Sequence, residues 1–439
     1  MTTATHRDRL AEQQEEGPMD LVLDSLSEDE SVGEDEVLTE TPIPSEHSTA
    51  SFVPDWPCSP RLVASSGNNV PSRLPMLSPD AANYARWCAW SPDATMLATA
   101  HADRTVRIWD SAAFLAQVDD ANTSVVAAEI AVADSITDAA WWPHGDGRKL
   151  AVAAPNLPVR LHSLEAPESG TGATITSAAY SAHDERSDTL ASATALAFSP
   201  TDAAQMLVGY TDGFLVPFDL TRPGLAPHGS GVRSAPTRAA SRKLGLYGLV
   251  SSIVYLPGYA AVASASYARA IGIYDARTLK VAHVMRGFKG APTTLAADPA
   301  TGGTYIAAAC RAPSGDVSLW DVRDVRAPVW SVPRARPMNM RTSIAWATPT
   351  LLAVGGCSVR GNEVWAIDAA TGSERHVVAA SSDGASAAAW CSVSNGEWWA
   401  VVSGERRTSD PSADRGLVQP EHLDNGVRVW QVAGQWTWA

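Results

Sequence analysis

The chain has few cysteines and few charged residues. Its cysteines are far apart in the sequence, are odd in number and form no Cys-x-x-Cys pair. That spacing argues against a disulfide framework and against a structural zinc site. Charged residues make up 18% of the chain, below the ~25% usual for soluble domains, whereas hydrophobic residues make up 45%. A chain of 439 residues with this composition can bury a large core without covalent cross-links.

The sequence also lacks signatures of secretion and membrane insertion. Met1 is followed by polar residues instead of an apolar segment, so we expect no secretory signal. The longest stretch without charge, 244–268, contains Pro257, Gly258 and several serines, which predicts two strands joined by a turn and not a membrane span. We therefore expect a soluble intracellular protein with no membrane partner.

Common catalytic motifs are missing as well. There is no nucleophile elbow, phosphate-binding loop, dinucleotide-binding glycine pattern or His-Glu-x-x-His motif. Histidines and acids form chance pairs, such as His183-Asp184, that lack the spacing of metal ligands. We predict a protein that is not an enzyme and that has no catalytic residues, metal or cofactor.

Acidic residues are concentrated near the N-terminus. Residues 1–60 hold fifteen of them against two arginines, and the rest of the chain is nearly neutral. The run Glu28–Glu36 has too few apolar side chains to offset the entropy cost of ordering. We predict a disordered acidic tail over residues 1–50 and one folded domain over residues 51–439. The tail would either dock basic partners or act only as a solvating segment.

A short pattern recurs seven times after this tail. Each copy has five residues. The first and third are mostly apolar, the fourth is often aromatic, and the fifth is most often an acid. The copies are spaced by about 54 residues on average, more than the ~40–45 of a minimal WD40 repeat, so the loops must carry extra residues. The fourth residues of the copies are Trp109, His162, Phe218, Tyr274, Trp320, Ile367 and Trp430.

Strand and turn signals surround these copies. Period-two alternation predicts half-buried strands, and turns rich in Ser, Pro, Asp and Gly separate them, most clearly at Ala89–Asp93 and Leu196–Pro200. Seven four-stranded units predict an all-β fold, a seven-bladed WD40 β-propeller. The second and third copies are degenerate, with His162-Ser163 in one and Pro217 in the other, so six or eight blades stay open alternatives.

Ring closure and blade packing give two further predictions. Since a closed ring leaves no long open sheet edge, we expect Arg61–Ala64 to pair with the last strand. We expect Trp109, Trp320 and Trp430 to pack between blades, and His101 and Asp103 to belong to a turn network and not to a catalytic pair.

Two segments are rich in arginine and are binding candidates. Residues 233–243 carry four basic residues and no acid, and residues 323–341 carry five arginines against Asp324. Cations beside flat or apolar neighbours, such as Trp330, suit phosphate contacts and base stacking on RNA. The alternative is that these cations balance acids on a nearly neutral surface. Our RNA-binding candidates in these segments are Arg242, Lys243, Arg334, Arg336, Asn339 and Arg341.

Several motifs in their order along the chain resemble the telomerase Cajal body protein family. They are Trp87–Asp93, Tyr180–Glu185, Arg222–Gly224, Ser264–Tyr274, Pro328–Ser331 and Asn339–Arg341. The resemblance covers about Trp87 to Gly434 and adds Tyr267 and Arg269 to the RNA-binding candidates.

The resemblance implies a scaffold protein located in the nucleus, including the Cajal body, with some of the protein in the cytoplasm. It implies a monomeric propeller that binds small nuclear or Cajal body RNA of the H/ACA type and its ribonucleoprotein. Such a scaffold would support telomerase RNA localisation or small nuclear RNA maturation, with other proteins bound through the loops.

Other functions stay open. A protein-only adaptor is one alternative, such as a splicing-associated scaffold or a cullin-type ubiquitin ligase substrate receptor, because Trp320-Asp321-Val322-Arg323 has the WDxR form. A histone or basic-peptide reader that uses the acidic tail is another.

Overall fold

Most of the described chain is β-strand. In the computed structural model, the described residues are 61–65, 85–116, 126–145, 148–164, 174–184, 189–226, 231–233, 246–311, 314–333, 341–358, 361–381, 385–393, 396–403 and 427–432. The predicted tail over residues 1–50 lies outside these residues. The predicted boundary at residue 51 therefore stays a prediction.

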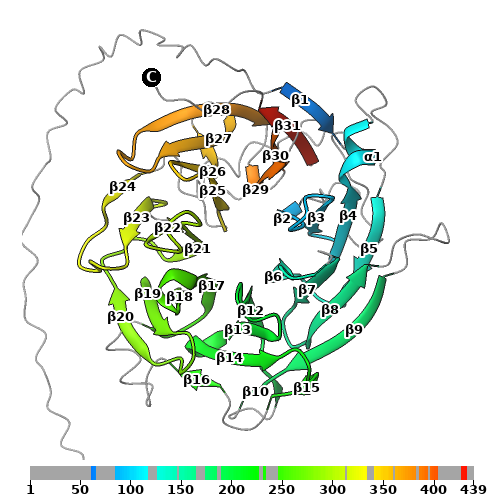
Figure 1. Ribbon diagram of the computed structural model, residues 1–439, viewed down its shortest axis with the longest axis vertical. Helices are drawn as coiled ribbons and strands as arrows, with labels where there is room; N and C mark the ends of the chain where they lie inside the picture. Colours follow the sequence, from blue (N-terminus) through cyan, green and yellow to red (C-terminus); the bar gives the residue numbers. More distant parts are fainter. Residues whose placement is uncertain are drawn as a thin grey trace, which may run out of the picture. The chain divides into compact units, whose positions relative to one another are not determined.

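The described strands form six four-stranded sheets, one five-stranded sheet and one two-stranded hairpin. The sheets surround a central axis, with the first strand of each sheet nearest the centre (Figure 1). This confirms the predicted all-β propeller.

The strands of the first part of the ring have the following bounds. One sheet contains β2 (Ala85–Trp90), β3 (Met96–His101), β4 (Thr105–Asp110) and β5 (Val126–Ala131), with α1 (Ser111–Ala116) after β4. The five-stranded sheet contains β6 (Asp138–Trp141), β7 (Lys149–Ala153), β8 (Val159–Leu164), β9 (Thr174–Ser181) and β15 (Gly224–Leu225). The hairpin pairs β10 (His183–Asp184) with β11 (Thr189–Leu190). The next sheet contains β12 (Ala193–Phe198), β13 (Gln205–Tyr210), β14 (Phe214–Asp219) and β16 (Val232–Arg233), with η1 (Thr211–Gly213) before β14.

The remaining sheets complete the ring. They contain β17 (Val250–Leu256), β18 (Ala261–Ser266), β19 (Ala270–Asp275) and β20 (Val281–Met285), with η2 (Pro257–Tyr259) after β17. Then come β21 (Pro292–Ala297), β22 (Tyr305–Cys310), β23 (Val317–Asp321) and β24 (Trp330–Val332). These are followed by β25 (Ile344–Thr348), β26 (Leu351–Ser358), β27 (Gly361–Asp368) and β28 (Glu374–Ser381). The last sheet contains β29 (Ala385–Val393), β30 (Gly396–Ser403), β31 (Val427–Val432) and β1 (Arg61–Ser65).

The recurring sequence pattern falls on the same strand of every sheet. β4, β8, β14, β19, β23, β27 and β31 each occupy the third position from the centre. The sheet built on the degenerate His162-Ser163 copy has a fifth strand because β15 pairs in parallel with β9, Gly224 opposite Tyr180. The Tyr180 hydroxyl also donates to the Leu220 carbonyl at 2.8 Å. Two sequence motifs that we noted separately therefore form one connection between neighbouring sheets.

The ring closes through the two ends of the folded chain. β1 pairs antiparallel with β31, with Arg61 opposite Gln431 and Leu62 opposite Trp430. This confirms the predicted pairing of Arg61–Ala64. It also leaves the third strand of that sheet paired on both sides, as closure requires.

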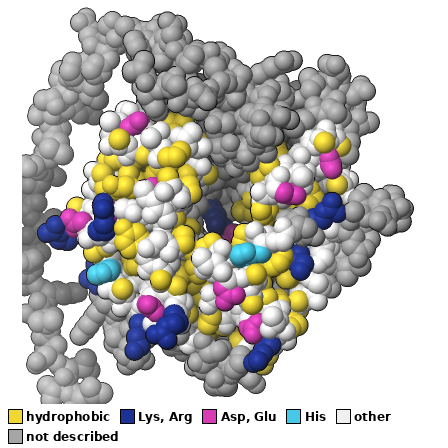
Figure 2. Space-filling model, in the orientation of Figure 1, with side chains coloured by type: hydrophobic (Ala, Val, Ile, Leu, Met, Phe, Trp, Pro, Cys, Tyr) yellow, Lys and Arg dark blue, Asp and Glu magenta, His cyan; other side chains and the backbone are white. Residues whose placement is uncertain are grey.

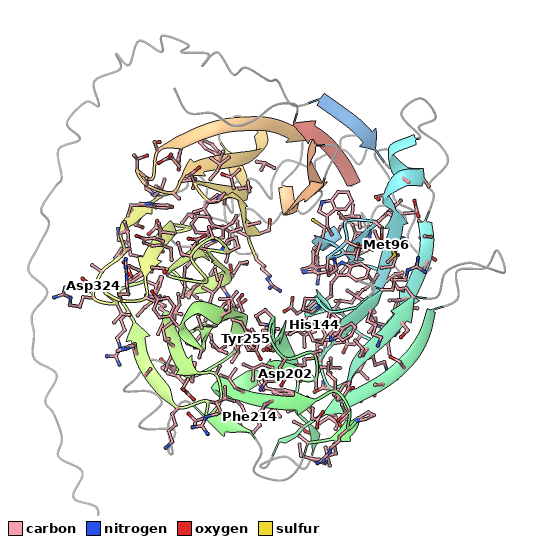
Figure 3. All side chains as sticks on the ribbon, in the orientation of Figure 1. Met96, His144, Asp202, Phe214, Tyr255 and Asp324 are labelled. Atoms are coloured by element: carbon pink, nitrogen blue, oxygen red, sulfur yellow. The ribbon has the colours of Figure 1, made fainter. Side chains whose placement is uncertain are left out.

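The core consists of apolar layers between neighbouring sheets (Figure 3). Trp320 is 2% exposed and packs in a cluster that combines residues of β17–β19 with residues of β21–β23. Trp109 is fully buried. Trp430 has its side chain outside the described set, so its packing stays a prediction. Close approach needs small residues: a Cβ on Gly209 would overlap the Val250 side chain.

The acids that end the pattern stabilise turns. Asp219, Asp275, Asp321 and Asp368 accept backbone N–H bonds from residues two or three positions later, at 2.7–2.9 Å. In the third sheet of the chain, Pro217 has no partner on the outer side, where β16 pairs with Phe214 and Leu215 alone among the described residues. Since proline has no N–H to donate, it fits a strand position that has no outer partner among the described residues.

The charge-free stretch forms the predicted pair of strands, β17 and β18, joined by η2. Among the described residues, no helix is long and apolar enough to cross a membrane. The side chains of Cys88 and Cys310 are buried, and burial raises the pKa of the Cys88 thiol. The remaining cysteines lie outside the residues whose side chains are described.

Candidate nucleic-acid interface at the channel mouth

The first strand of most sheets begins with a β-bulge at the same face of the ring. We call this face the mouth face, and the opposite one the far face. At each bulge one extra residue stands opposite no partner, and a bulge of this kind redirects a side chain. The extra residues whose side chains are described are Arg86, Thr194, Ser251 and Thr293.

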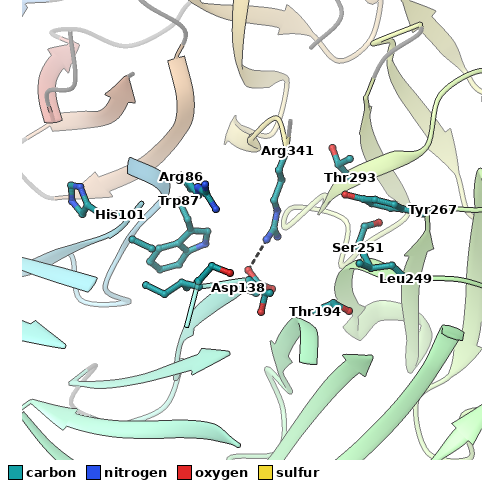
Figure 4. Close-up of a pocket in the computed structure, with 14 residues that line it drawn as sticks. Arg86, Trp87, His101, Asp138, Thr194, Leu249, Ser251, Tyr267, Thr293 and Arg341 are labelled. Atoms are coloured by element: carbon teal, nitrogen blue, oxygen red, sulfur yellow. Dashed lines mark hydrogen bonds and ion pairs between the residues drawn. The ribbon is translucent and has the colours of Figure 1, made fainter. Parts of the chain in front are cut away.

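All four bulge side chains line one cavity of about 300 Å³ at the end of the central channel. Figure 2 shows the ring hollowed at its centre, with basic side-chain atoms visible in the hollow. Arg341, Asp138 and Tyr267 also line the cavity (Figure 4). The mouth therefore combines arginines, one carboxylate, hydroxyls and aromatic rings.

An ion pair crosses the mouth. Arg341 Nη1 donates to Asp138 Oδ1 at 2.7 Å, although Asp138 begins β6 and Arg341 lies just before β25, in distant parts of the ring. The Asp138 side chain is 5% exposed, and its Oδ2 accepts the Leu196 N–H at 2.8 Å. The Arg341 side chain is 30% exposed. Asp138 thus fixes one edge of the guanidinium, and the rest of Arg341 reaches solvent in the cavity.

His101 lines the cavity as a neutral residue. Its Nε2 contacts Thr99 Oγ1 at 2.8 Å, and the same oxygen accepts the Trp109 indole N–H at 2.8 Å. Burial, and then the charge of Arg107, lower the pKa of His101 to about 3. Arg107 binds Asp103 through both Nη atoms, at 3.2 and 2.7 Å. His101 and Asp103 therefore belong to a structural network, as predicted.

An aromatic and basic rim lies along one side of the cavity, at the sheets of β17–β20 and β21–β24. Tyr267, 39% exposed, lies in the turn between β18 and β19, and Arg311 Cζ lies 5.1 Å from the centre of its ring. Arg269 is exposed in the same turn and has φ +65°. Tyr247, 42% exposed, is held beside this turn because the Ser266 hydroxyl donates to its carbonyl. We call these four residues the rim.

The structure brings three of the predicted site residues to this face: Tyr267, Arg269 and Arg341. The others, Arg242, Lys243, Arg334, Arg336 and Asn339, lie outside the described residues. They belong to the stretches of chain between β16 and β17 and between β24 and β25.

The arginine-rich segment 323–341 does not form one patch. Arg323 and Arg326 follow β23 at the far face, and each binds a nearby acid at 2.6 Å: Arg323 to Asp321 and Arg326 to Asp324. In Figure 3, Asp324 lies at the periphery of the ring, far from the centre. The hydrogen bonds from Arg326 lower the pKa of Asp324 to about 2. Two of the five arginines, Arg323 and Arg326, therefore lie on the opposite face of the ring from Arg341, because β24 runs between them.

Sequence analysis missed most residues of this site, namely Arg86, Asp138, Thr194, Ser251 and Thr293 of the cavity and Tyr247 and Arg311 of the rim. Arg86 could have been found from a shared pattern, because the second residue of several inner strands is polar. Arg86 follows Ala85 in the same way that Thr194 follows Ala193 and Ser251 follows Val250. Arg311 and Tyr247 carry no such signal. Among the described residues, no group of three His, Cys, Asp or Glu side chains could hold a metal.

The ring of sheets and its polar channel mouth place the chain in the class of all-β propellers. No family model matches it. Telomerase Cajal body protein 1 of Homo sapiens is 26% identical over 292 residues, 65% of this chain and 50% of that protein. The Mesocricetus auratus protein of that name is 27% identical over 296 residues, 66% of this chain and 52% of its own length. The Mus musculus protein is 28% identical over 265 residues, which are 59% of this chain and 46% of that protein.

The chain is a distant homologue of telomerase Cajal body protein 1, which confirms the resemblance drawn from the motifs. It spans about half the length of the curated relatives it matches.

Proposed function

We propose that the protein is a nuclear scaffold that binds RNA at the mouth face of its propeller. The observation that supports this most is that Tyr267 and Arg341 line one cavity, with Arg311 over the Tyr267 ring and Arg269 exposed in the same turn as Tyr267. Flat aromatic rings and arginine planes stack on unpaired bases, and arginine forks bind phosphates. Asp138 neutralises one arginine, and His101 is uncharged, so the described side chains of the site stay net positive.

The distribution of charge between the two faces of the ring also supports RNA binding at the mouth face. Among the described residues, the mouth face carries Arg86, Arg104, Arg269, Arg311 and Arg341. The far face carries the turn-stabilising carboxylates Asp219, Asp275, Asp321 and Asp368. The far face also carries Arg222, Arg323 and Arg326, which pair with acids of the same turns, so an anionic strand is attracted more strongly to the mouth face than to the far face.

The RNA in this proposal is a small nuclear or Cajal body RNA of the H/ACA type. The homologues carry telomerase and the Cajal body in their name, which supports a role in telomerase RNA localisation or in small nuclear RNA maturation. Its partners are that ribonucleoprotein and proteins bound through the loops. Its location is the nucleus, with some protein in the cytoplasm.

The proposal includes a monomeric propeller of seven blades that carries out no catalysis. The five-stranded sheet is the blade of the degenerate second copy, with β15 added at its edge. Arg242, Lys243, Arg334, Arg336 and Asn339 extend the RNA contact of the rim.

Charge reversal tests the proposal. We expect the double variant Arg269→Glu/Arg311→Glu to lose binding to small nuclear RNAs from the protein's own cells, and wild-type affinity to fall steeply with salt. The matched control is Arg277→Glu, because Arg277 is exposed at the far end of the same sheet as Arg269.

Equal binding by the double variant and the control would contradict RNA contact at the mouth face. Recovery of protein partners with no RNA from the same extract would instead favour the protein-only adaptor.

A further inference from the structure

We propose that the base-paired stem of the bound RNA lies outside the cavity, on the connection between β20 and β21. This inference rests on the proposed function and goes beyond it, because it assigns a duplex contact and a direction in which the RNA leaves the mouth. It depends on where this connection lies, how it is held, and which chemical groups it presents.

Residues 286–291, which we call the basic connection, join β20 to β21 at the mouth face. β20 ends at this face because Met285 stands opposite Ile271, beside the rim turn between β18 and β19. β21 begins there with its bulge. The Arg311 N–H donates to the Ala291 carbonyl at 2.9 Å. The basic connection therefore adjoins the rim on the side away from the cavity.

Packing against the core fixes the basic connection. Phe288 is 9% exposed and belongs to the apolar cluster between the sheets of β17–β20 and β21–β24. Its ring centre lies 4.8 Å from that of Trp320. A Cβ on Gly290 would overlap the Arg311 carbonyl, so the backbone passes close to that turn. The cations of the connection therefore stand on a backbone that is anchored beside the rim.

The basic connection presents cations and no aromatic face. Arg286 and Lys289 are exposed, whereas its one ring, that of Phe288, is turned into the core. Proteins bind unpaired strands by combining cations with rings on which bases stack, but they hold duplex RNA by its phosphates and ribose hydroxyls. Exposed cations without an exposed ring therefore suit a base-paired strand, whose bases are not available for stacking.

The distribution of charge within the mouth face gives the stem its direction. On the sheets of β17–β20 and β21–β24, the described residues of this face hold one acid, Asp316, and the cations Arg269, Arg286, Lys289 and Arg311. On the other side of the ring, the connection between β5 and β6 carries Asp134 (Figure 1). The cation beside it, Arg104, donates to the Ala133 carbonyl at 2.9 Å. A duplex that starts at the cavity is therefore drawn across the basic connection.

The experiment measures how salt changes the binding of the full chain to two labelled RNAs. One is a hairpin with about eight base pairs and a mixed loop of about ten nucleotides, and the other is that loop as a linear strand. Each phosphate that a cation neutralises adds about 0.9 to the slope of log affinity against log salt. We expect the double variant Arg286→Gln/Lys289→Gln to lose about two units of this slope with the hairpin and none with the linear strand.

Two variants serve as controls. Arg277→Gln removes an exposed cation at the far end of the same sheet and should leave both slopes unchanged. The double variant Arg286→Lys/Lys289→Arg keeps both charges and should retain the hairpin slope.

The outcomes separate this inference from the proposed function. An equal loss of slope with both RNAs would assign the basic connection to an unpaired strand, and unchanged slopes with both would exclude a contact there. Either result overturns the stem site and leaves RNA binding standing. A loss of hairpin slope in Arg104→Gln and not in the double variant would overturn the direction. Absence of wild-type binding to both RNAs would overturn the proposed function as well.

Discussion

The pair Tyr210→Phe and Tyr180→Phe should change stability in opposite directions. Both tyrosines are buried in the same apolar cluster, at 2% and 0% exposure, and both rings contact a phenylalanine. The Tyr180 hydroxyl donates to the Leu220 carbonyl at 2.8 Å, whereas the Tyr210 hydroxyl has no hydrogen-bond partner among the described residues. The two substitutions remove the same oxygen from rings of equal burial.

The magnitude follows from hydrogen-bond energetics. A buried polar group without a partner costs ~1–3 kcal/mol, so its removal should make Tyr210→Phe more stable by about 1 kcal/mol. Tyr180→Phe loses a bond worth about 1 kcal/mol and leaves the Leu220 carbonyl without that donor, so we expect a loss of ~1–2 kcal/mol.

Urea titration of the full chain, followed by tryptophan fluorescence, measures both free energies of unfolding. A Tyr210→Phe variant that is destabilised as much as Tyr180→Phe would refute the argument that satisfied and unsatisfied hydroxyls determine the sign.

Three further perturbations test the ring and the site. Deleting residues 1–65 removes β1 and should lower the unfolding temperature by several degrees, whereas deleting residues 1–60 keeps β1 and should not; equal temperatures would contradict closure through β1 and β31. Burial lowers the pKa of His101 to about 3, so the folded state favours the neutral ring; stability is then complete above the unfolded pKa near 6.5 and falls by about 1.4 kcal/mol per pH unit from there toward pH 3. His101→Gln should remove this part of the loss in urea titrations at pH 7 and pH 5, and an unchanged loss would contradict a buried neutral ring. A double-mutant cycle of Asp138→Asn and Arg341→Gln should give a coupling energy of about 1–3 kcal/mol, and a value near zero would show that the ion pair does not hold the mouth.

Much of the fold could be predicted from the sequence, because a propeller repeats local information. Each third strand carries the same apolar pattern, and each of its acids stabilises the turn that follows, so seven copies could be aligned without a structure. Ring closure by Arg61–Ala64 followed from the physical need to cover sheet edges. The added strand β15 could not be foreseen, because a two-residue strand that crosses to the preceding sheet has no periodicity.

The site was less predictable, because it is built from residues far apart in the sequence. Asp138 and Arg341 are 203 positions apart, and no local pattern links them. Arginine density suggested that 323–341 was one patch, but Arg323 follows β23 at the far face, whereas Arg341 precedes β25 at the mouth face. A sequence reading counts charges along the chain, whereas an interface depends on which end of a strand each charge occupies.

Ultraviolet crosslinking of the full chain to RNA in its own cells, with mass spectrometry of the crosslinked peptides, tests the central claim most directly. Tyr267 at the mouth face and Tyr259 at the far face are equally exposed, at 39% and 41%, and belong to neighbouring turns of the same sheet. Crosslinks at Tyr267 and none at Tyr259, with small nuclear RNA attached, is the predicted result. Crosslinks at Tyr259 alone, or no RNA on either turn, would contradict RNA binding at the channel mouth.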